Sequence, residues 1–335
     1  MAFSEARAGK GGRVPHRAKV VLTDYVWDSL EVEQKALEGL ADLVALRAKT
    51  PDEFLDEAAD CDALLNTYAG PITARVMERM PKCKIIARYG IGVDTIDVDA
   101  ATAAGIIVTN NPTYCIEEVA EHTMALLLAC ARKVPFYDRM VRAGKWAVPP
   151  GKPIFRLAGQ TLGLVGFGRI GKQVAARAAA FGMRILFHDP YLQGEGTDLQ
   201  TLLRSSDFVS LHPPLTPQTR RLIGDAQLRL MKPTAYLVNC ARGPVIDTDA
   251  LVRALDAGTI AGCALDTTDP EPLPDPHPLR GRENVILQPH VAWYSEESMR
   301  GLQAGAPSEV HRVLTGTWPV NVVNRAVKER NRAGL

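Results

Sequence analysis

Residues 161–171 read Thr161-Leu-Gly-Leu-Val-Gly-Phe-Gly-Arg-Ile-Gly171, a buried apolar run that leads into three closely spaced glycines. The alanine-rich residues 172–180 that follow have a helical pattern, so the glycines are expected at a strand-to-helix turn. In such a turn Gly166 permits the tight bend, Gly168 lets a pyrophosphate approach the backbone, and Gly171 lets helix and strand pack closely. The helix N-terminus then faces the phosphates with free N–H groups. This stretch predicts a dinucleotide-binding domain.

An acidic residue at the end of the next apolar run supports this interpretation. That run, residues 184–189, ends in Asp189, close to the spacing from Gly171 at which a carboxylate accepts hydrogen bonds from the adenosine ribose hydroxyls. Because a carboxylate repels a 2′-phosphate, we predict NAD(H) in preference to NADP. The alternative is a glycine-rich turn in a flavodoxin-like sheet, with Asp189 merely ending a strand.

The composition of the chain is that of a globular protein. Its 335 residues are 46% apolar and 23% charged, which is enough for two domains that each bury a core. A net charge of +1 gives no general attraction to nucleic acid or to an anionic membrane. The longest apolar run, residues 124–131, is too short to span a bilayer. Six scattered cysteines without a Cys-x-x-Cys pair favour a reducing cytoplasm and predict no metal site.

After residue 18, short apolar or β-branched runs alternate with helical patterns, as in parallel βαβ folds. The first 18 residues have no apolar core and are predicted to be a flexible tail. The strands expected in the first half are residues 19–23, 42–46, 63–66, 84–89 and 106–110. Those expected in the second half are residues 161–165, 184–188, 208–212, 235–240, 260–266 and 285–290.

Helix signals complete the prediction. Thr50-Pro-Asp-Glu53 pairs a capping hydroxyl with a glutamate three residues later, and proline stands at the first helical position, so a helix is expected to begin there. Residues 116–143 form a long helical pattern, which the proline-rich residues 146–153 end. A last helix is expected over residues 295–314.

These elements predict an α/β protein of two doubly wound, parallel-sheet domains with a cleft between them. A flavodoxin-like substrate-binding domain is expected to be discontinuous, comprising residues 19–112 and 296–335. Residues 113–295 are expected to form a Rossmann NAD-binding domain.

Polar residues stand just after predicted strands, where doubly wound sheets bind ligands. Arg242 and His290 follow or end two of these strands, and Glu271 lies in the loop Asp269-Pro-Glu-Pro272. A histidine can take the hydroxyl proton when a hydride leaves a carbinol carbon, and a carboxylate partner fixes its tautomer. A guanidinium can grip a substrate carboxylate and polarise a 2-oxo group. The alternatives are an ion-pairing surface arginine, a solvated acid and a backbone-bonded histidine.

Six stretches also carry a resemblance to a known family. They are Arg88-Tyr-Gly-Ile-Gly-Val-Asp94, Glu118-Val-Ala-Glu-His122, residues 163–171, Val238-Asn-Cys-Ala-Arg-Gly243, Leu265-Asp266 with Glu271-Pro272, and Gln288-Pro-His-Val-Ala-Trp293. In these stretches the chain resembles the D-2-hydroxyacid dehydrogenases, which include phosphoglycerate dehydrogenase and glyoxylate/hydroxypyruvate reductase. The resemblance implies hydride transfer between NAD(H) and a 2-hydroxy acid/2-oxo acid pair. It also implies that the long helix helps to form a homodimer.

The resemblance assigns roles to individual residues. His290 is implied to be the acid/base assisted by Glu271, and Arg242 to bind the substrate carboxylate and 2-oxo group. Asp266 is implied to contact the nicotinamide amide, and the backbone amides near Ile91 and Gly92 to receive the carboxylate. Substrate contacts are predicted at Tyr89, Ile91, Gly92, Arg242 and Trp293. Cofactor contacts are predicted at Gly166, Gly168, Arg169, Ile170, Gly171, Asp189, His212, Pro213, Thr219, Cys240, Arg242, Asp266 and His290.

Ala292-Trp-Tyr-Ser295 and Thr113-Tyr-Cys-Ile-Glu-Glu118 look closest to the C-terminal-binding-protein branch, which includes NAD-sensing corepressors. Two alternative functions are therefore considered. One is an active dehydrogenase, which the intact set of Arg242, Glu271 and His290 favours, and the other is an NAD(H)-sensing binding protein. The chain departs from the family in having Thr267 and Thr268 where a bulky residue is usual, which predicts a more polar or roomier pocket wall. The segment after Asp189 is also short, which leaves little room for the usual third strand.

Overall fold

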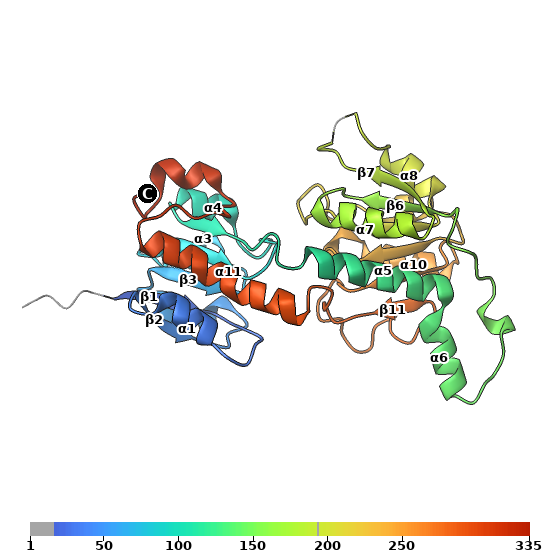
Figure 1. The fold of residues 1–335 in the computed structure, drawn as a ribbon, viewed down its shortest axis with the longest axis horizontal. Coiled ribbons are helices and arrows are strands. Elements are labelled where there is room, and N and C mark those ends of the chain that lie inside the picture. Colours follow the sequence, from blue (N-terminus) through green and yellow to red (C-terminus); the bar gives the residue numbers. More distant parts are fainter. Residues whose placement is uncertain (1–16, 193) are drawn as a thin grey trace, which may run out of the picture. The chain divides into compact units, whose positions relative to one another are not determined.

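A computed structural model describes residues 17–192 and 194–335 of the chain. The predicted tail, residues 1–18, lies outside the described residues except for its last two. The chain divides into two compact units (Figure 1): unit 1 comprises the residues up to Pro112 with Arg300–Leu335, and unit 2 comprises Thr113–Met299. Each unit is built on one parallel sheet, so the predicted α/β class with two parallel sheets is confirmed.

Unit 1 has a five-stranded sheet in the order β2-β1-β3-β4-β5, the order of flavodoxin-like sheets. Every residue of β3 and β4 is buried, as expected for central strands covered on both faces. The strands are β1 (Ala18–Leu22), β2 (Ala41–Ala45), β3 (Ala63–Asn66), β4 (Ile85–Arg88) and β5 (Ile107–Thr109). The helices are α1 (Glu31–Leu37), α2 (Leu55–Ala58), α3 (Ala74–Glu78), α4 (Val98–Ala103), most of α11 (Glu296–Leu314), and the 3₁₀ turns η1 (Pro51–Glu53) and η4 (Arg325–Arg330).

Unit 2 has a six-stranded sheet in the order β11-β10-β9-β8-β6-β7. Its strands are β6 (Thr161–Val165), β7 (Arg184–His188), β8 (Phe208–Leu211), β9 (Tyr236–Asn239), β10 (Gly262–Leu265) and β11 (Val285–Leu287). Its helices are α5 (Ile116–Arg132), α6 (Val134–Arg142), α7 (Arg169–Ala180), α8 (Leu199–Ser205), α9 (Asp225–Leu228), α10 (Thr248–Asp256), and the 3₁₀ turns η2 (Pro149–Gly151) and η3 (Gly243–Val245).

Helices cover both faces of the unit 2 sheet. Helices α5 and α7 pack side by side against one face (Figure 1). On the other face one apolar cluster joins buried residues of α8, α9 and α10 to alternate strand residues, such as Leu237 of β9 and Leu265 of β10. Because successive strand residues point to opposite faces, Val238 is buried on the side of α5 and α7. The carboxyl ends of the six parallel strands lie along one edge of the sheet, where doubly wound sheets bind ligands.

The long helix predicted over residues 116–143 is wrong in one respect, because the structure has two helices there. Lys133 separates α5 from α6 and has a left-handed φ of 53°. Pro135, near the start of α6, lacks the amide hydrogen that a continuous helix would need. Pro135 is therefore a sequence signal for the break, which the helical pattern on both sides of it obscures.

The helix predicted to begin at Thr50 is also different in the structure. The segment forms the 3₁₀ turn η1 and then the short α2, and the side chain of Thr50 does not cap it. Instead the Thr50 hydroxyl donates to Glu53 Oε1 at 3.2 Å, and Lys49 N donates to Glu53 Oε2 at 3.0 Å. The two groups expected to form a capping box are therefore bonded to each other and to the preceding loop.

The short segment after Asp189 has the consequence that the sequence predicted. Within the described residues, no strand pairs with the outer edge of β7, so β7 is the edge strand of the sheet. The backbone of Thr197 donates one hydrogen bond of 2.8 Å to Phe187 O, and Thr197 O lies 3.0 Å from His188 Nδ1. One residue thus contacts the edge that a third strand would cover.

Candidate active site

The glycine turn joins β6 to α7 with backbone geometry that excludes larger residues. Gly166 has a φ of 92°, which favours glycine. A Cβ atom on Gly171 would lie 2.5 Å from the carbonyl oxygen of Gly166, so helix and turn are in backbone contact. A Cβ on Gly168 would meet no atom within 4 Å, so the backbone at the N-terminus of α7 faces open space. A pyrophosphate fits such a backbone cradle.

Asp189 lies beside this turn and is held by two backbone amides. Its Oδ2 accepts a hydrogen bond of 2.8 Å from Phe167 N, and its Oδ1 accepts one of 3.0 Å from Tyr191 N. The rings of Phe167 and Phe187 stack with centroids 3.9 Å apart, which ties the turn to β7. Each carboxylate oxygen can accept more than one hydrogen bond, so Asp189 retains acceptor capacity for ribose hydroxyls.

Several further predicted cofactor residues lie at the carboxyl edge of the same sheet. Arg169 and Ile170 open α7, and His212 and Pro213 follow β8. A Cβ on Gly166 would lie 2.8 Å from the carbonyl carbon of His212, so the loop after β8 touches the glycine turn. These residues therefore surround the backbone cradle.

Burial sets the protonation of two of these groups. It lowers the pKa of His212 to about 4, which keeps the imidazole neutral, with Nε2 2.9 Å from Ser210 Oγ. It raises the pKa of the Cys240 thiol, which directly follows β9, to about 12. The hydroxyl of Thr219 donates to Pro214 O at 2.6 Å and so closes the loop after β8. His212 and Cys240 are therefore both uncharged at neutral pH.

Arg242 lies three residues after the end of β9, on a backbone fixed by a buried amide. Asn239 Nδ2 donates to the carbonyl oxygen of Arg242 at 2.9 Å, and Asn239 Oδ1 accepts from Ala241 N at 3.0 Å. Arg242 is half-buried, and its Nη1 donates to Ala241 O at 2.8 Å. The structure thus presents the arginine from a rigid strand end.

Glu271 and His290 are in direct contact. Glu271 Oε1 lies 2.6 Å from His290 Nδ1, within a charge-assisted hydrogen bond. The imidazole side chain is 22% exposed and the carboxylate side chain 41% exposed. His290 has a left-handed φ of 55°, unusual for a residue that is not glycine. The structure therefore holds this imidazole in a backbone conformation that needs outside support.

Asp266 supplies that support. This carboxylate is 1% exposed, and it accepts hydrogen bonds from Val291 N at 2.9 Å and Ala292 N at 3.1 Å. Its backbone carbonyl accepts a third bond, of 2.8 Å, from His290 N. His122 Nε2 on α5 lies 3.6 Å from Asp266 Oδ1. Asp266 thus fixes the turn that carries His290, beyond the nicotinamide contact that the family resemblance implies.

Trp293 and the two threonines after β10 complete the described surroundings. Trp293 is half-buried, with its ring centroid 6.3 Å from that of Tyr114, and its carbonyl accepts a 2.6 Å bond from Ser298 Oγ. Thr267 is buried, whereas the Thr268 hydroxyl donates to Pro270 O at 2.9 Å. The hydroxyl of Thr268 is therefore bonded to the Glu271 loop.

The remaining predicted substrate residues belong to unit 1 and follow β4. Tyr89 is 2% exposed and its hydroxyl donates to the buried Glu33 at 3.2 Å, so its side chain is part of the unit 1 core. The carbonyl of Ile91 accepts a 2.7 Å bond from Asn110 Nδ2. In the described part of the chain, neither Ile91 N nor Gly92 N donates a hydrogen bond. Both amides are thus available to an acceptor such as a carboxylate.

The structure brings Glu271 and His290 into contact. Arg242 follows β9, and β9 pairs directly with β10 in the sheet. Two other side chains near these residues had no catalytic motif to mark them. His122 lay inside a family-like stretch, but its approach to Asp266 depends on packing between α5 and β10. Thr248 bonds to the Glu271 loop, and nothing in its local sequence indicates a contact 21 residues away.

The sheet, the glycine turn and Asp189 define unit 2 as a dinucleotide-binding domain, and comparisons with known proteins identify the family. Residues 124–292 match the D-isomer specific 2-hydroxyacid dehydrogenase, NAD binding domain. Glyoxylate reductase of Korarchaeum cryptofilum is 46% identical over 286 residues, which cover 82% of this chain and 86% of that protein. D-3-phosphoglycerate dehydrogenase of Methanocaldococcus jannaschii is 41% identical over 315 residues, covering 91% of this chain and 59% of that protein.

A solved structure agrees with the sequence relatives. The TT0316 protein from Thermus thermophilus superimposes with a TM-score of 0.83 at 39% identity, covering 91% of this chain and 99% of that one. The chain belongs to the D-isomer specific 2-hydroxyacid dehydrogenases, which are NAD-dependent enzymes. Of the helices in residues 17–192 and 194–335, none has both the length and the apolar character of a membrane span.

Proposed function

We propose that the enzyme reduces a small 2-oxo acid, or oxidises the matching 2-hydroxy acid, with His290 as the acid/base. The 2.6 Å contact between Glu271 Oε1 and His290 Nδ1 carries this proposal. A carboxylate at Nδ1 fixes the tautomer and orients the ring. The proton that is exchanged with the substrate oxygen is then at Nε2. During reduction His290 donates this proton, and during oxidation it accepts the hydroxyl proton.

Arg242 is proposed to bind the carboxylate and the 2-oxo oxygen of the substrate. A guanidinium offers parallel N–H donors that match a carboxylate, and its charge polarises a neighbouring carbonyl. The bond from Asn239 to Arg242 O holds the backbone from which the side chain extends. In unit 1, the amides of Ile91 and Gly92 are proposed to receive the substrate carboxylate as well.

The cofactor is proposed to bind unit 2 by the residues around the glycine turn. When bound, NADH would supply the hydride for the 2-oxo carbon. The backbone at Gly168 and the start of α7 would bind the pyrophosphate, and Asp189 the adenosine ribose. Asp266 would orient the nicotinamide amide while its oxygens hold Val291 and Ala292.

The substrate class is proposed from the relatives and from the pocket residues. Relatives named glyoxylate reductase and D-3-phosphoglycerate dehydrogenase suggest glyoxylate, hydroxypyruvate or a phosphorylated acid as candidates. Trp293 would also permit a larger apolar tail, as in the C-terminal-binding-protein branch. We place the small unphosphorylated acids first, because the more similar relative is a glyoxylate reductase.

The test is NADH oxidation with a panel of 2-oxo acids, comparing the wild type with His290→Gln. We expect turnover with at least one small acid, its loss in the variant, and NADH affinity that is nearly unchanged. If the wild type binds NADH tightly but turns over no acid in the panel, the sensing function of corepressor type replaces the enzymatic one. A parallel loss of NADH affinity in His290→Gln would assign His290 a structural role.

A homodimer is proposed from apolar side chains on α6 and the segment after it. Trp146 is 90% exposed and Val148 67% exposed, and Val134 and Phe155 are also exposed. Several exposed apolar side chains in one segment of chain favour an interaction surface. Light scattering should give the mass of two chains, and Trp146→Asp should shift the mass towards one. We also propose a cytoplasmic location, consistent with six free and buried thiols.

A further inference from the structure

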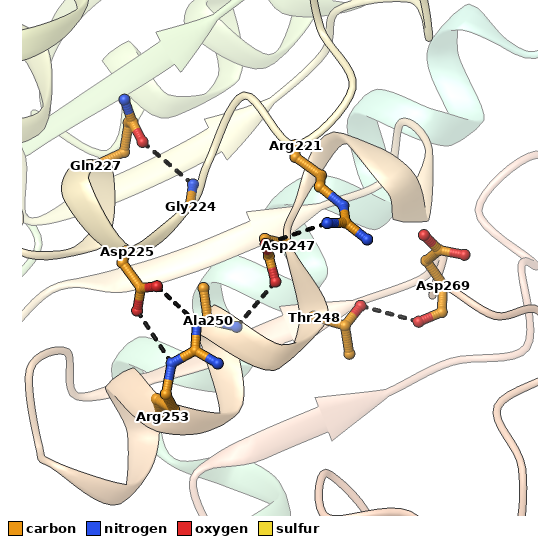
Figure 2. A network of polar contacts seen from close by, with 9 residues as sticks. All are labelled: Arg221, Gly224, Asp225, Gln227, Asp247, Thr248, Ala250, Arg253 and Asp269. Atoms are coloured by element: carbon orange, nitrogen blue, oxygen red, sulfur yellow. Dashed lines mark hydrogen bonds and ion pairs between the residues drawn. The ribbon is translucent and has the colours of Figure 1, made fainter.

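A hydroxyl on the first turn of α10 holds the loop that carries Glu271. Thr248 is the first residue of α10, and its Oγ1 donates a 2.9 Å hydrogen bond to the carbonyl oxygen of Asp269 (Figure 2). Asp269 precedes Glu271 by two residues. The bond therefore fixes the backbone just before the point from which the Glu271 side chain reaches His290 Nδ1.

The start of α10 is itself firmly held. Asp247 caps the helix by accepting a 3.0 Å bond from Ala250 N, and Arg221 lies 3.8 Å from the same carboxylate (Figure 2). The backbone of Asp247 donates a 2.9 Å bond to Ile223 O. The hydroxyl of Thr248 is thus presented from a fixed position, since the residue before it has three separate restraints.

Helix α10 is also tied to its neighbour α9. Arg253 on α10 lies 2.6 Å from the carboxylate of Asp225 on α9, and Gln227 Oε1 accepts a 3.3 Å bond from Gly224 N at the start of α9 (Figure 2). The surface charges of this pair contribute little alone. Together with the apolar cluster beneath both helices, they leave α10 little freedom to move.

The segment that leads into α10 begins at Arg242. Gly243 follows it, and a Cβ on Gly243 would overlap the carbonyl oxygen of Thr268, so the two backbones are in contact. Two contacts therefore join the segment of Arg242 to the loop of Glu271: Gly243 with Thr268, and Thr248 with Asp269. The contact of Gly243 with Thr268 is steric and only limits how closely the loop can approach. The bond from Thr248 to Asp269 is directional and fixes where the loop lies.

The Glu271 side chain is exposed, so few contacts hold it directly, and its position depends on how firmly the loop backbone is held. The carboxylate side chain of Glu271 is 41% exposed, and an exposed glutamate loses rotamer freedom when it is held in one position. Within the loop, Thr268 Oγ1 donates to Pro270 O at 2.9 Å. That bond shapes the loop but ties it to no other element, so the tie to α10 comes from Thr248.

We propose that Thr248 is a positioning residue that sets Glu271 against His290 and keeps both in register with Arg242. This inference rests on the proposed roles of those three residues. Thr248 touches no reacting atom and acts only through Asp269 and the loop. Loss of its hydroxyl would allow the carboxylate to leave Nδ1, and the imidazole would then lose the group that fixes its tautomer.

The test compares Thr248→Val, which removes the hydroxyl and keeps the shape, with Thr248→Ser, which keeps the hydroxyl. We expect kcat to fall about 10-fold in the valine variant, because small misplacements of catalytic groups are costly, with KM nearly unchanged. The serine variant should remain within about two-fold of the wild type. Equal kcat values in the wild type and Thr248→Val would overturn the proposal.

A double-mutant cycle tests whether Thr248 acts through Glu271. If it does, Thr248→Val should cause no further loss in a Glu271→Gln background, because the group that it positions is already gone. If the two losses multiply, Thr248 acts by another route and the proposal is wrong.

A readout without turnover separates this inference from the proposed function. Exchange of the His290 ring protons with solvent is followed by NMR in the free protein, with the signal assigned by its absence in His290→Gln. We expect faster exchange in Thr248→Val and in Glu271→Gln, and wild-type exchange in Thr248→Ser. If no 2-oxo acid is turned over but these differences hold, the proposed function fails and the positioning survives. Unchanged exchange in Thr248→Val overturns the positioning even in an active enzyme.

The folding of each variant is checked by thermal unfolding and by NADH binding, to which Thr248 makes no contribution in this proposal. Thr248→Ala is a second variant without the hydroxyl and should reproduce the effects of Thr248→Val. If neither variant folds while Thr248→Ser does, the hydroxyl is required for folding and its assignment as a positioning group is overturned.

Discussion

A Cβ atom on Gly171 would lie 2.5 Å from the carbonyl oxygen of Gly166, whereas one on Gly168 would lie in open space. Gly171 is therefore required for close packing of the helix on the turn, whereas Gly168 leaves space beside the backbone, although both belong to one motif. We expect Gly171→Ala to lower the free energy of unfolding by roughly 1–3 kcal/mol, as overpacking does. Gly168→Ala should leave stability nearly unchanged and weaken NADH binding about 10-fold, because its methyl group would occupy the space of the pyrophosphate.

Urea denaturation and NADH fluorescence titration of both variants measure these effects. Each variant serves as the control for the other, since they make the same chemical change three residues apart. Equal stability losses at the two positions would contradict the open space at Gly168, and unchanged NADH affinity in Gly168→Ala would show that this space is not a ligand cradle.

Asp189 is expected to set the cofactor preference. Its carboxylate is fixed beside the glycine turn by Phe167 N and Tyr191 N, so its charge cannot move away from a 2′-phosphate. Asp189→Ala should therefore lower the preference for NADH over NADPH by about 10-fold or more, measured as the ratio of the two kcat/KM values. Asp189→Asn keeps an acceptor without the charge and should relax the preference while disturbing the turn less. An unchanged ratio in both variants would remove Asp189 as the ribose partner.

The strands could be predicted from the sequence because parallel strands are continuous apolar runs bounded by turns. The structure confirms strands in all eleven predicted runs, and β3, β6 and β7 have the predicted bounds. That no strand of the described residues lies beyond β7 could also be predicted, because the segment after Asp189 is short. The break at Lys133 has one local signal, Pro135, but the helical pattern on both sides obscures it, and nothing in the sequence marks the left-handed backbone angle of Lys133.

Some residues of the candidate site could also be predicted from the sequence, and some of its contacts could not. The glycines and Asp189 are recognisable because backbone contact requires glycine and a charge is required at a fixed spacing. Glu271 and His290 are 19 positions apart, so their pairing could be proposed from the chemistry of hydride transfer and from the family resemblance, but not from a local pattern. The bonds that Asp266 accepts from Val291 N and Ala292 N, and the bond that Thr248 donates to Asp269 O, depend on tertiary packing and have no local signal.

Glu271→Gln should reduce kcat about 100-fold with little change in NADH affinity. The amide keeps the shape of the side chain but replaces the carboxylate that accepts from Nδ1, and partners that orient a histidine typically contribute at this level. Single-turnover kinetics with saturating NADH would measure the effect. A comparable kcat in wild type and variant would mean that the contact of 2.6 Å in the structure has no part in proton transfer.

The buried imidazole of His212 should make stability depend on pH. Burial lowers its pKa in the folded protein to about 4, whereas an exposed histidine in the unfolded chain titrates near 6.5. Between these values the unfolded chain binds a proton that the folded protein does not. The stabilisation is therefore complete above pH 6.5 and is lost as the pH falls towards 4. Lowering the pH from 7 to 5 should remove about 2 kcal/mol from the free energy of unfolding through this residue. In His212→Gln that part of the pH dependence should be absent, as measured by urea denaturation at the two pH values. A loss of the same size in the variant would assign the pH dependence to other groups.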